Sequence, residues 1–202
     1  MDEDKKRKKS RKKIITCILI LVGIIVAAWI GLNVYMRFAT PKKYMIKTEN
    51  HIDFQPNLEC SGFSSAYVLR SLGVNADGME LYQQIPNKNP DGTVTVDTLA
   101  AFLSQTYDVK VCNGTIWQFK NEISKGVPVI AFVRISPDST YYHYLPIVGY
   151  DEENVYAAES LRNLYNAEET YYNRKIPLKD FMNMWDTEVV TKNTYITIGL
   201  KK

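Results

Sequence analysis

The sequence has few of the residues that build disulfide or metal scaffolds: its 202 residues include three cysteines and two histidines. Cys17 lies in an apolar run, so only Cys60 and Cys112 remain for a folded domain, and at most one disulfide can form there. With His51 and His143 as the only histidines, and no Cys/His cluster at ligand spacing, the sequence argues against a structural zinc site.

Excess positive charge is missing from most of the chain. The net charge is +3, but residues 1–13 carry eight basic and three acidic residues, which leaves a net charge of −2 for the remainder. A basic tail alone can indicate nucleic-acid binding. Here an apolar run follows the tail directly, so we expect a basic cytoplasmic tail at 1–13 and no nucleic-acid partner.

The apolar run from Ile14 to Tyr35 contains no charged residue over 22 positions. At about 1.5 Å per helical residue, this length crosses a hydrocarbon core of about 30 Å. Because the basic residues flank its N-terminal side, the positive-inside rule places the N-terminus in the cytoplasm and the following domain outside the cell. We therefore predict a single-pass protein of the cell membrane.

The expected division of the chain is a transmembrane signal-anchor helix at 14–36, a linker at 37–45 and an extracellular domain at 46–202. A cleaved signal peptide is the alternative. The apolar run is longer than the core of a normal signal peptide, and no clear small-x-small cleavage site follows it, which favours an uncleaved anchor.

Within the domain, the patterns predict helices mostly in the first half and strands mostly in the second. Helices are expected at 60–72, 81–85, 98–105 (capped by Asp97), 116–125 (capped by Thr115) and 178–185, and strands at 107–111, 128–135, 142–149, 154–159 and 195–200. This order favours an α+β fold over alternating βαβ units.

Cys60 opens the first predicted helix of the domain, where backbone N–H groups and the helix dipole favour an anion such as a thiolate. The alternatives are a buried structural cysteine and a disulfide with Cys112. His143 begins an apolar strand after a polar loop, and a Cys–His pair would have to use it because His51 lies near the linker. A buried core histidine is the alternative for His143.

Two further side chains have less specific patterns. Glu159 ends the strand after the one that carries His143, where a carboxylate could accept the imidazole N–H; an exposed strand-end Glu is the alternative. Gln55 lies five residues before Cys60, where its amide could form an oxyanion hole with the Cys60 backbone N–H, although a loop Gln usually has no such role.

Four segments in this order resemble the papain-like cysteine peptidases, and within them the bacteriocin-processing (double-glycine leader) peptidases and their free-standing relatives. They are QPNLECSGFSSAYVLRSLG, TIWQFKNEISKGVPVIAFV, HYLPIVGYDEENVYAAES and IPLKDFMNMW, and the likeness covers roughly residues 46–200. The resemblance implies a papain-like fold, with an N-terminal nucleophile helix packed on an antiparallel sheet. It implies no metal and no cofactor.

The resemblance also implies roles. Cys60 would attack a scissile carbonyl, His143 would take and return the proton, Glu159 would orient His143, and Gln55 would hold the oxyanion. The sequence departs from the family where Ser61 and Gly62 follow the cysteine in place of a direct Gly, and where Glu159-Ser160 stands for the usual Asp or Asn, often followed by Pro. Asp151 is a second candidate acid, although its setting favours a turn.

The expected function is a membrane-anchored cysteine peptidase, a hydrolase that cleaves a secreted or surface peptide or protein. We expect no transporter segment in this chain, so a transporter would be a separate partner, as would another surface protein. Two alternatives stay open: a catalytically inactive peptidase-like domain that acts as a binding module, and a related amidase or acyl-transfer enzyme.

Overall fold

The computed structural model describes residues 2–187 and 192–201. It contains two units, residues 1–39 and residues 40–202, which are described separately here. The expected tail at 1–13 and domain at 46–202 include Met1, residues 188–191 and Lys202, which lie outside the described residues.

The first unit is one helix, α1 (Asp2–Ala39). Its part from Arg11 to Ala39 is long and apolar enough to cross a membrane, by length and composition. The helix runs beyond residue 36, so the first residues of the linker expected over 37–45 are helical. Pro41 explains the observed end, because a proline disfavours helical backbone at the residue before it.

The second unit is built on a seven-stranded antiparallel sheet in the order β2-β7-β3-β4-β5-β6, with β1 paired to β4. The strands are β1 (Tyr44–Met45), β2 (Tyr107–Asn113), β3 (Val129–Arg134), β4 (Tyr142–Tyr150), β5 (Asn154–Ala157), β6 (Arg174–Pro177) and β7 (Thr194–Leu200). The five predicted strands are all present, and β1 and β6 were missed. Both are short, and a strand of two to four residues shows almost no alternation in sequence.

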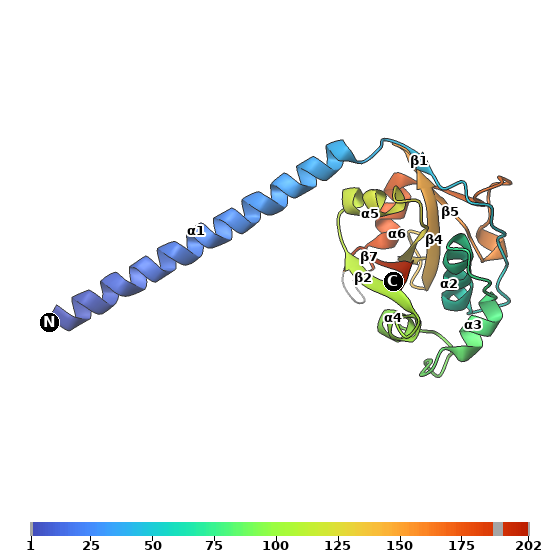
Figure 1. Ribbon diagram of the computed structural model, residues 1–202, viewed down its shortest axis with the longest axis horizontal. Helices are drawn as coiled ribbons and strands as arrows, with labels where there is room; N and C mark the ends of the chain where they lie inside the picture. The colour runs from blue at the N-terminus through green and yellow to red at the C-terminus, as the bar shows by residue number, and fades with distance from the viewer. Residues whose placement is uncertain (1, 188–191, 202) are drawn as a thin grey trace. The chain divides into compact units, whose positions relative to one another are not determined.

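Helices cover both faces of this sheet. They are α2 (Cys60–Ser71), α3 (Gly78–Gln84), α4 (Val96–Leu103), α5 (Ile116–Ile123) and α6 (Leu178–Trp185), with a short 3-10 turn η1 (Arg162–Leu164). One apolar cluster joins α2 and α4 to the sheet, and a second joins α5 and α6 to it. Figure 1 shows α5 and α6 on one side of β4 and α2 on the other. The predicted α+β fold, with the helix that begins at Cys60 packed on an antiparallel sheet, is confirmed.

Helix starts follow the local capping chemistry. Thr115 caps α5 in a full capping box with Gln118, as the predicted cap required. The predicted cap Asp97 was wrong: Thr95 caps α4 through its hydroxyl, and Asp97 falls in the first turn. The predicted helix at 81–85 begins earlier, because the Asp77 side chain accepts from the backbone N–H groups of Met79 and Glu80.

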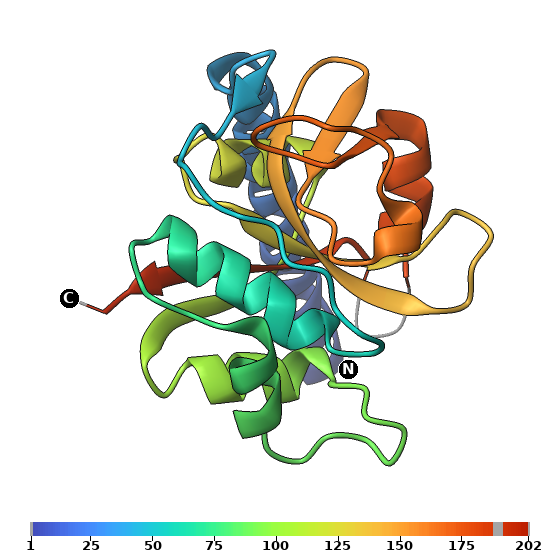
Figure 2. The same cartoon turned by 90° about the vertical axis from the view of Figure 1, so that its right-hand side faces the viewer.

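Helix α2 begins at Cys60, as predicted, and lies close to α3. Gly62 allows this approach, because a Cβ there would lie 2.3 Å from the Gly78 carbonyl oxygen. Gly73 follows the helix with φ +81°, the left-handed conformation expected of a C-terminal cap. The segment before α2 runs along the β4–β5 hairpin (Figure 2) and is bonded to it from Ile46 N–H to the Val148 carbonyl.

Candidate active site

Cys60 is the first residue of α2, and its side chain lines a pocket of about 480 Å³. Its N-cap residue, Glu59, makes no side-chain cap to the helix. The first N–H groups of a helix carry a partial positive charge that stabilises a thiolate. Cys60 and Cys112 are free thiols, so the alternative of a disulfide between them is wrong.

His143 lies at the start of β4, opposite Val133 of β3, and only 1% of it is exposed. Its side chain and that of Cys60 line the same pocket, and Cys60 lies near enough to raise the pKa of His143. Its Nε2 atom lies 2.8 Å from Glu159 Oε1, which leaves Nδ1 as the ring nitrogen for the thiol. Burial would lower the pKa of His143, but the charge of Glu159, its hydrogen bond to His143 and the nearby Cys60 outweigh burial and raise that pKa well above its ordinary value.

Glu159 lies two residues after β5 and is fully buried. Its Oε1 accepts hydrogen bonds from His143 Nε2 and from the Leu161 backbone N–H at 2.7 Å, and its Oε2 accepts from Arg174 Nη1 at 2.7 Å. Burial would raise the pKa of Glu159, but the charge of His143 and its hydrogen bond, followed by the charge of Arg174, lower that pKa well below its usual range. The alternative of an exposed strand-end Glu is therefore wrong.

Two residues that hold Glu159 escaped the sequence-based prediction. Arg174 is 7% exposed, and its Nη2 also donates to the Ile135 carbonyl at 2.8 Å, so both ends of its guanidinium are fixed. Asn173 accepts from the Glu159 N–H and donates to the Glu159 carbonyl. Arg174 is the first residue of β6, which pairs it with Ala157 of β5, and Asn173 directly precedes this strand. The sequence signal that could have indicated this role was the basic side chain of Arg174 in a short strand.

Gln55 lines the same pocket as Cys60 and is 8% exposed. Its Nε2 donates to the Asn57 carbonyl at 2.6 Å, and its Oε1 accepts from the Ser160 hydroxyl at 2.5 Å. The Nε2 amide carries two hydrogens, so one remains for another acceptor. The predicted donor is thus at the pocket, beside the residue that follows Glu159.

The other polar candidates lie elsewhere. His51 forms an exposed pair with Asp53 at 3.3 Å. Asp151 accepts from the backbone N–H groups of Glu153 and Asn154, which identifies it as a turn residue. Cys112 is half-buried. Among the described residues, no group of three or more Cys, His, Asp or Glu side chains could hold a metal ion.

The pocket walls are largely apolar and aromatic. Phe132 stacks on Tyr142 at 5.4 Å between ring centroids, and the Tyr144 hydroxyl donates to the Val94 carbonyl at 2.9 Å. The loop at 89–95 supplies polar side chains to the rim. A thiol, an imidazole and an amide donor therefore line one pocket, with the buried carboxylate of Glu159 behind the imidazole, a set suited to acyl transfer through a thioester.

Residues 45–191 match the Peptidase_C39 like family, which is more than half of the chain. The chain belongs to this C39-like peptidase family. The match spans every segment that forms the pocket, from Gln55 to Asn163, and also Arg174, which holds Glu159. Family membership supports a peptidase function, and it confirms the resemblance to bacteriocin-processing peptidases and their relatives.

Solved structures show the same C39-like fold. A C39-like peptidase from Bacillus anthracis superposes with a TM-score of 0.60 at 18% identity, over 80% of this chain and 99% of that chain. The peptidase domain of Streptococcus ComA, a bifunctional ABC transporter involved in a quorum-sensing pathway, superposes with a TM-score of 0.59 at 13% identity, over 76% and 99% of the two chains. No curated protein matches the sequence.

Proposed function

We propose that this C39-like protein is a cysteine peptidase that hydrolyses peptide bonds in a secreted or surface peptide or protein. One observation carries the proposal: Cys60 and His143 line the same pocket, and His143 is hydrogen-bonded on its other side to the fully buried carboxylate of Glu159. A histidine with only a structural role would not require a carboxylate that is itself bound by a buried arginine.

The chemistry follows from this arrangement. The Cys60 thiolate attacks the scissile carbonyl, and the carbonyl oxygen becomes an oxyanion near the Gln55 amide and the Cys60 N–H. The protonated His143 gives its proton to the leaving amine, and a thioester to Cys60 remains. His143 then takes a proton from water, whose oxygen attacks the thioester and releases the acid and the thiol.

Glu159 keeps His143 correctly oriented through these steps and stabilises its protonated form. An aspartate has one methylene fewer, and the Arg174 guanidinium occupies the space beyond the carboxylate. The longer Glu side chain is therefore matched to a position between His143 and Arg174, so we interpret its presence as a variation of the acid and not as a sign of an inactive domain.

We also propose that α1 anchors the domain in the cell membrane, with residues 1–13 in the cytoplasm and the peptidase domain, 46–202, outside. The charge-free run and the basic residues before it support this orientation. A transporter or another surface protein would then meet the domain as a separate partner.

The function is tested with the full chain in detergent micelles and a library of unstructured peptides, with products identified by mass spectrometry. Wild type and Cys112→Ala should cleave the same peptides, and Cys60→Ala should cleave none. Cleavage that survives Cys60→Ala would contradict the proposal. A deamidated peptide or a transfer product in place of two hydrolysed fragments would instead indicate an amidase or an acyl-transfer enzyme.

A further inference from the structure

The bond between Ser160 and Gln55 connects two parts of the site that are 105 positions apart in sequence. The Ser160 hydroxyl donates to Gln55 Oε1 at 2.5 Å, and the Gln55 backbone N–H donates to the Ser160 carbonyl at 2.9 Å. Both residues are buried, with 4% of Ser160 and 8% of Gln55 exposed. The Gln55 side chain and main chain are therefore both fixed by the residue that follows Glu159.

The orientation of the Gln55 amide is defined by its partners. The atom that faces the Asn57 carbonyl at 2.6 Å must be nitrogen, because a carbonyl can only accept. The oxygen therefore faces Ser160, whose hydroxyl can donate to it. Without that hydroxyl, Oε1 would have no partner in a buried position, and the amide would gain freedom to rotate away from the pocket.

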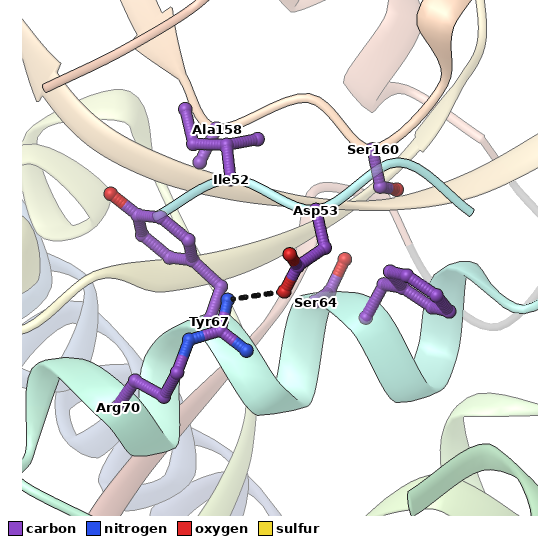
Figure 3. A pocket seen from close by; sticks show the side chains of 8 residues that line it. Ile52, Asp53, Ser64, Tyr67, Arg70, Ala158 and Ser160 are labelled. Atoms are coloured by element: carbon purple, nitrogen blue, oxygen red, sulfur yellow. Dashed lines mark ion pairs between the residues drawn. The ribbon is translucent and has the colours of Figure 1, made fainter. Parts of the chain in front are cut away.

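The segment that delivers Gln55 is held from its other side as well. Asp53 pairs with Arg70 of α2 at 3.1 Å, and the Arg70 guanidinium also donates to the His51 carbonyl. Figure 3 shows this ion pair on one side of the segment and Ser160 on the other. Arg70 fixes the course of the main chain, while Ser160 bonds to the amide of Gln55.

We propose that Ser160 is a positioning residue for the oxyanion hole, acting through Gln55. This inference rests on the proposed function. Glu159 and Ser160 then form a two-residue unit: the carboxylate orients the base, and the hydroxyl orients the oxyanion donor. The serine that replaces the frequent proline of the resembled peptidases thereby has a role that proline, without a side-chain hydroxyl, cannot perform.

The test compares Ser160→Ala, Ser160→Thr and Gln55→Ala in the full chain, with Ser124→Ala as the matched control, since the Ser124 hydroxyl donates to the Asn121 carbonyl in α5. Complete removal of an oxyanion donor costs about 10²–10³ in kcat. Because Asn57 still holds the amide, Ser160→Ala should lower kcat by about tenfold with KM unchanged, Ser160→Thr should restore most of it, and Ser124→Ala should match wild type.

Two readouts separate positioning from a loss of structure. Affinity for a peptide aldehyde, whose hemithioacetal carries an oxyanion, should fall in Ser160→Ala, while the rate of Cys60 alkylation by iodoacetamide should not change, because alkylation creates no oxyanion. Adding Ser160→Ala to Gln55→Ala should cause no further loss of kcat.

Equal kcat and equal aldehyde affinity in Ser160→Ala and wild type would overturn the inference, as would fully additive losses in the double variant. If wild type itself neither cleaves peptides nor reacts at Cys60, the proposed function fails instead. The two failures are therefore distinguishable.

Discussion

Replacing Glu159 by Gln removes one charge and almost no volume at the centre of the site. Every described neighbour of the carboxylate is a donor: His143 Nε2 and the Leu161 N–H face Oε1, and Arg174 Nη1 faces Oε2. A Gln amide has one acceptor and one donor end, so in either orientation its NH₂ group would face another donor. The variant therefore loses both a charge and a hydrogen bond.

The expected size of the effect follows from the burial of this pair. His143 and Glu159 are 1% and 0% exposed, so solvent does not screen them. A hydrogen bond to a charged group contributes about 1.5–3 kcal/mol. Because the imidazolium forms in the reaction, we expect kcat/KM of Glu159→Gln to fall by about 10²-fold, at about 1.4 kcal/mol for each factor of ten.

The pH dependence of kcat/KM should also shift in a defined direction. Glu159 raises the pKa of His143, so the imidazolium persists to higher pH than for a free histidine and is lost as the pH rises through the raised value. In Glu159→Gln that pKa falls, and the alkaline limb of kcat/KM should move to lower pH. The assay is peptide hydrolysis from pH 5 to 10, with the exposed Glu49→Gln as control. An unchanged rate and an unchanged alkaline limb would refute this account of the third residue.

Three further predictions concern stability and orientation. Arg174→Met should lower the free energy of unfolding in urea by about 3 kcal/mol, because it leaves the Glu159 charge buried without its cation; exposed Lys43→Met should not. Gly62→Ala should cost about 1–3 kcal/mol or more in the same assay, since its Cβ would meet the Gly78 carbonyl at 2.3 Å, and a variant as stable as wild type would contradict this packing. Protease added to intact cells should remove the domain and spare a tag on the N-terminus; the reverse would contradict the proposed orientation.

Much of the fold could be predicted because its elements are long and strongly patterned. The apolar run of β3 and the strand β4, which carries His143, are examples, as is α6, whose predicted bounds match the observed ones. The cap of α4 was predicted wrongly because Thr95 and Asp97 are both good capping residues two positions apart, and only the backbone decides between them.

The sequence predicted the candidate site residues themselves, but not the residues that hold them in place. Cys60, His143 and Glu159 could be proposed because each lies at or near an element boundary, and Gln55 because it precedes Cys60, all in the order of a known family. Arg174 could not be proposed, because its relation to Glu159 depends on the pairing of β5 with the short strand β6, and sequence spacing does not encode register between strands. The same holds for the Ser160–Gln55 bond.

The central claim, that Cys60 is a nucleophile activated by His143, is tested most directly by the rate of thiol alkylation in the folded full chain at neutral pH. Cys112 is the internal control, because burial raises the pKa of its thiol. Mass spectrometry after a short exposure to iodoacetamide should find the label on Cys60 and little on Cys112, and His143→Ala should slow the labelling of Cys60. A folded protein in which Cys60 stays unlabelled, or reacts no faster than Cys112, would contradict the claim.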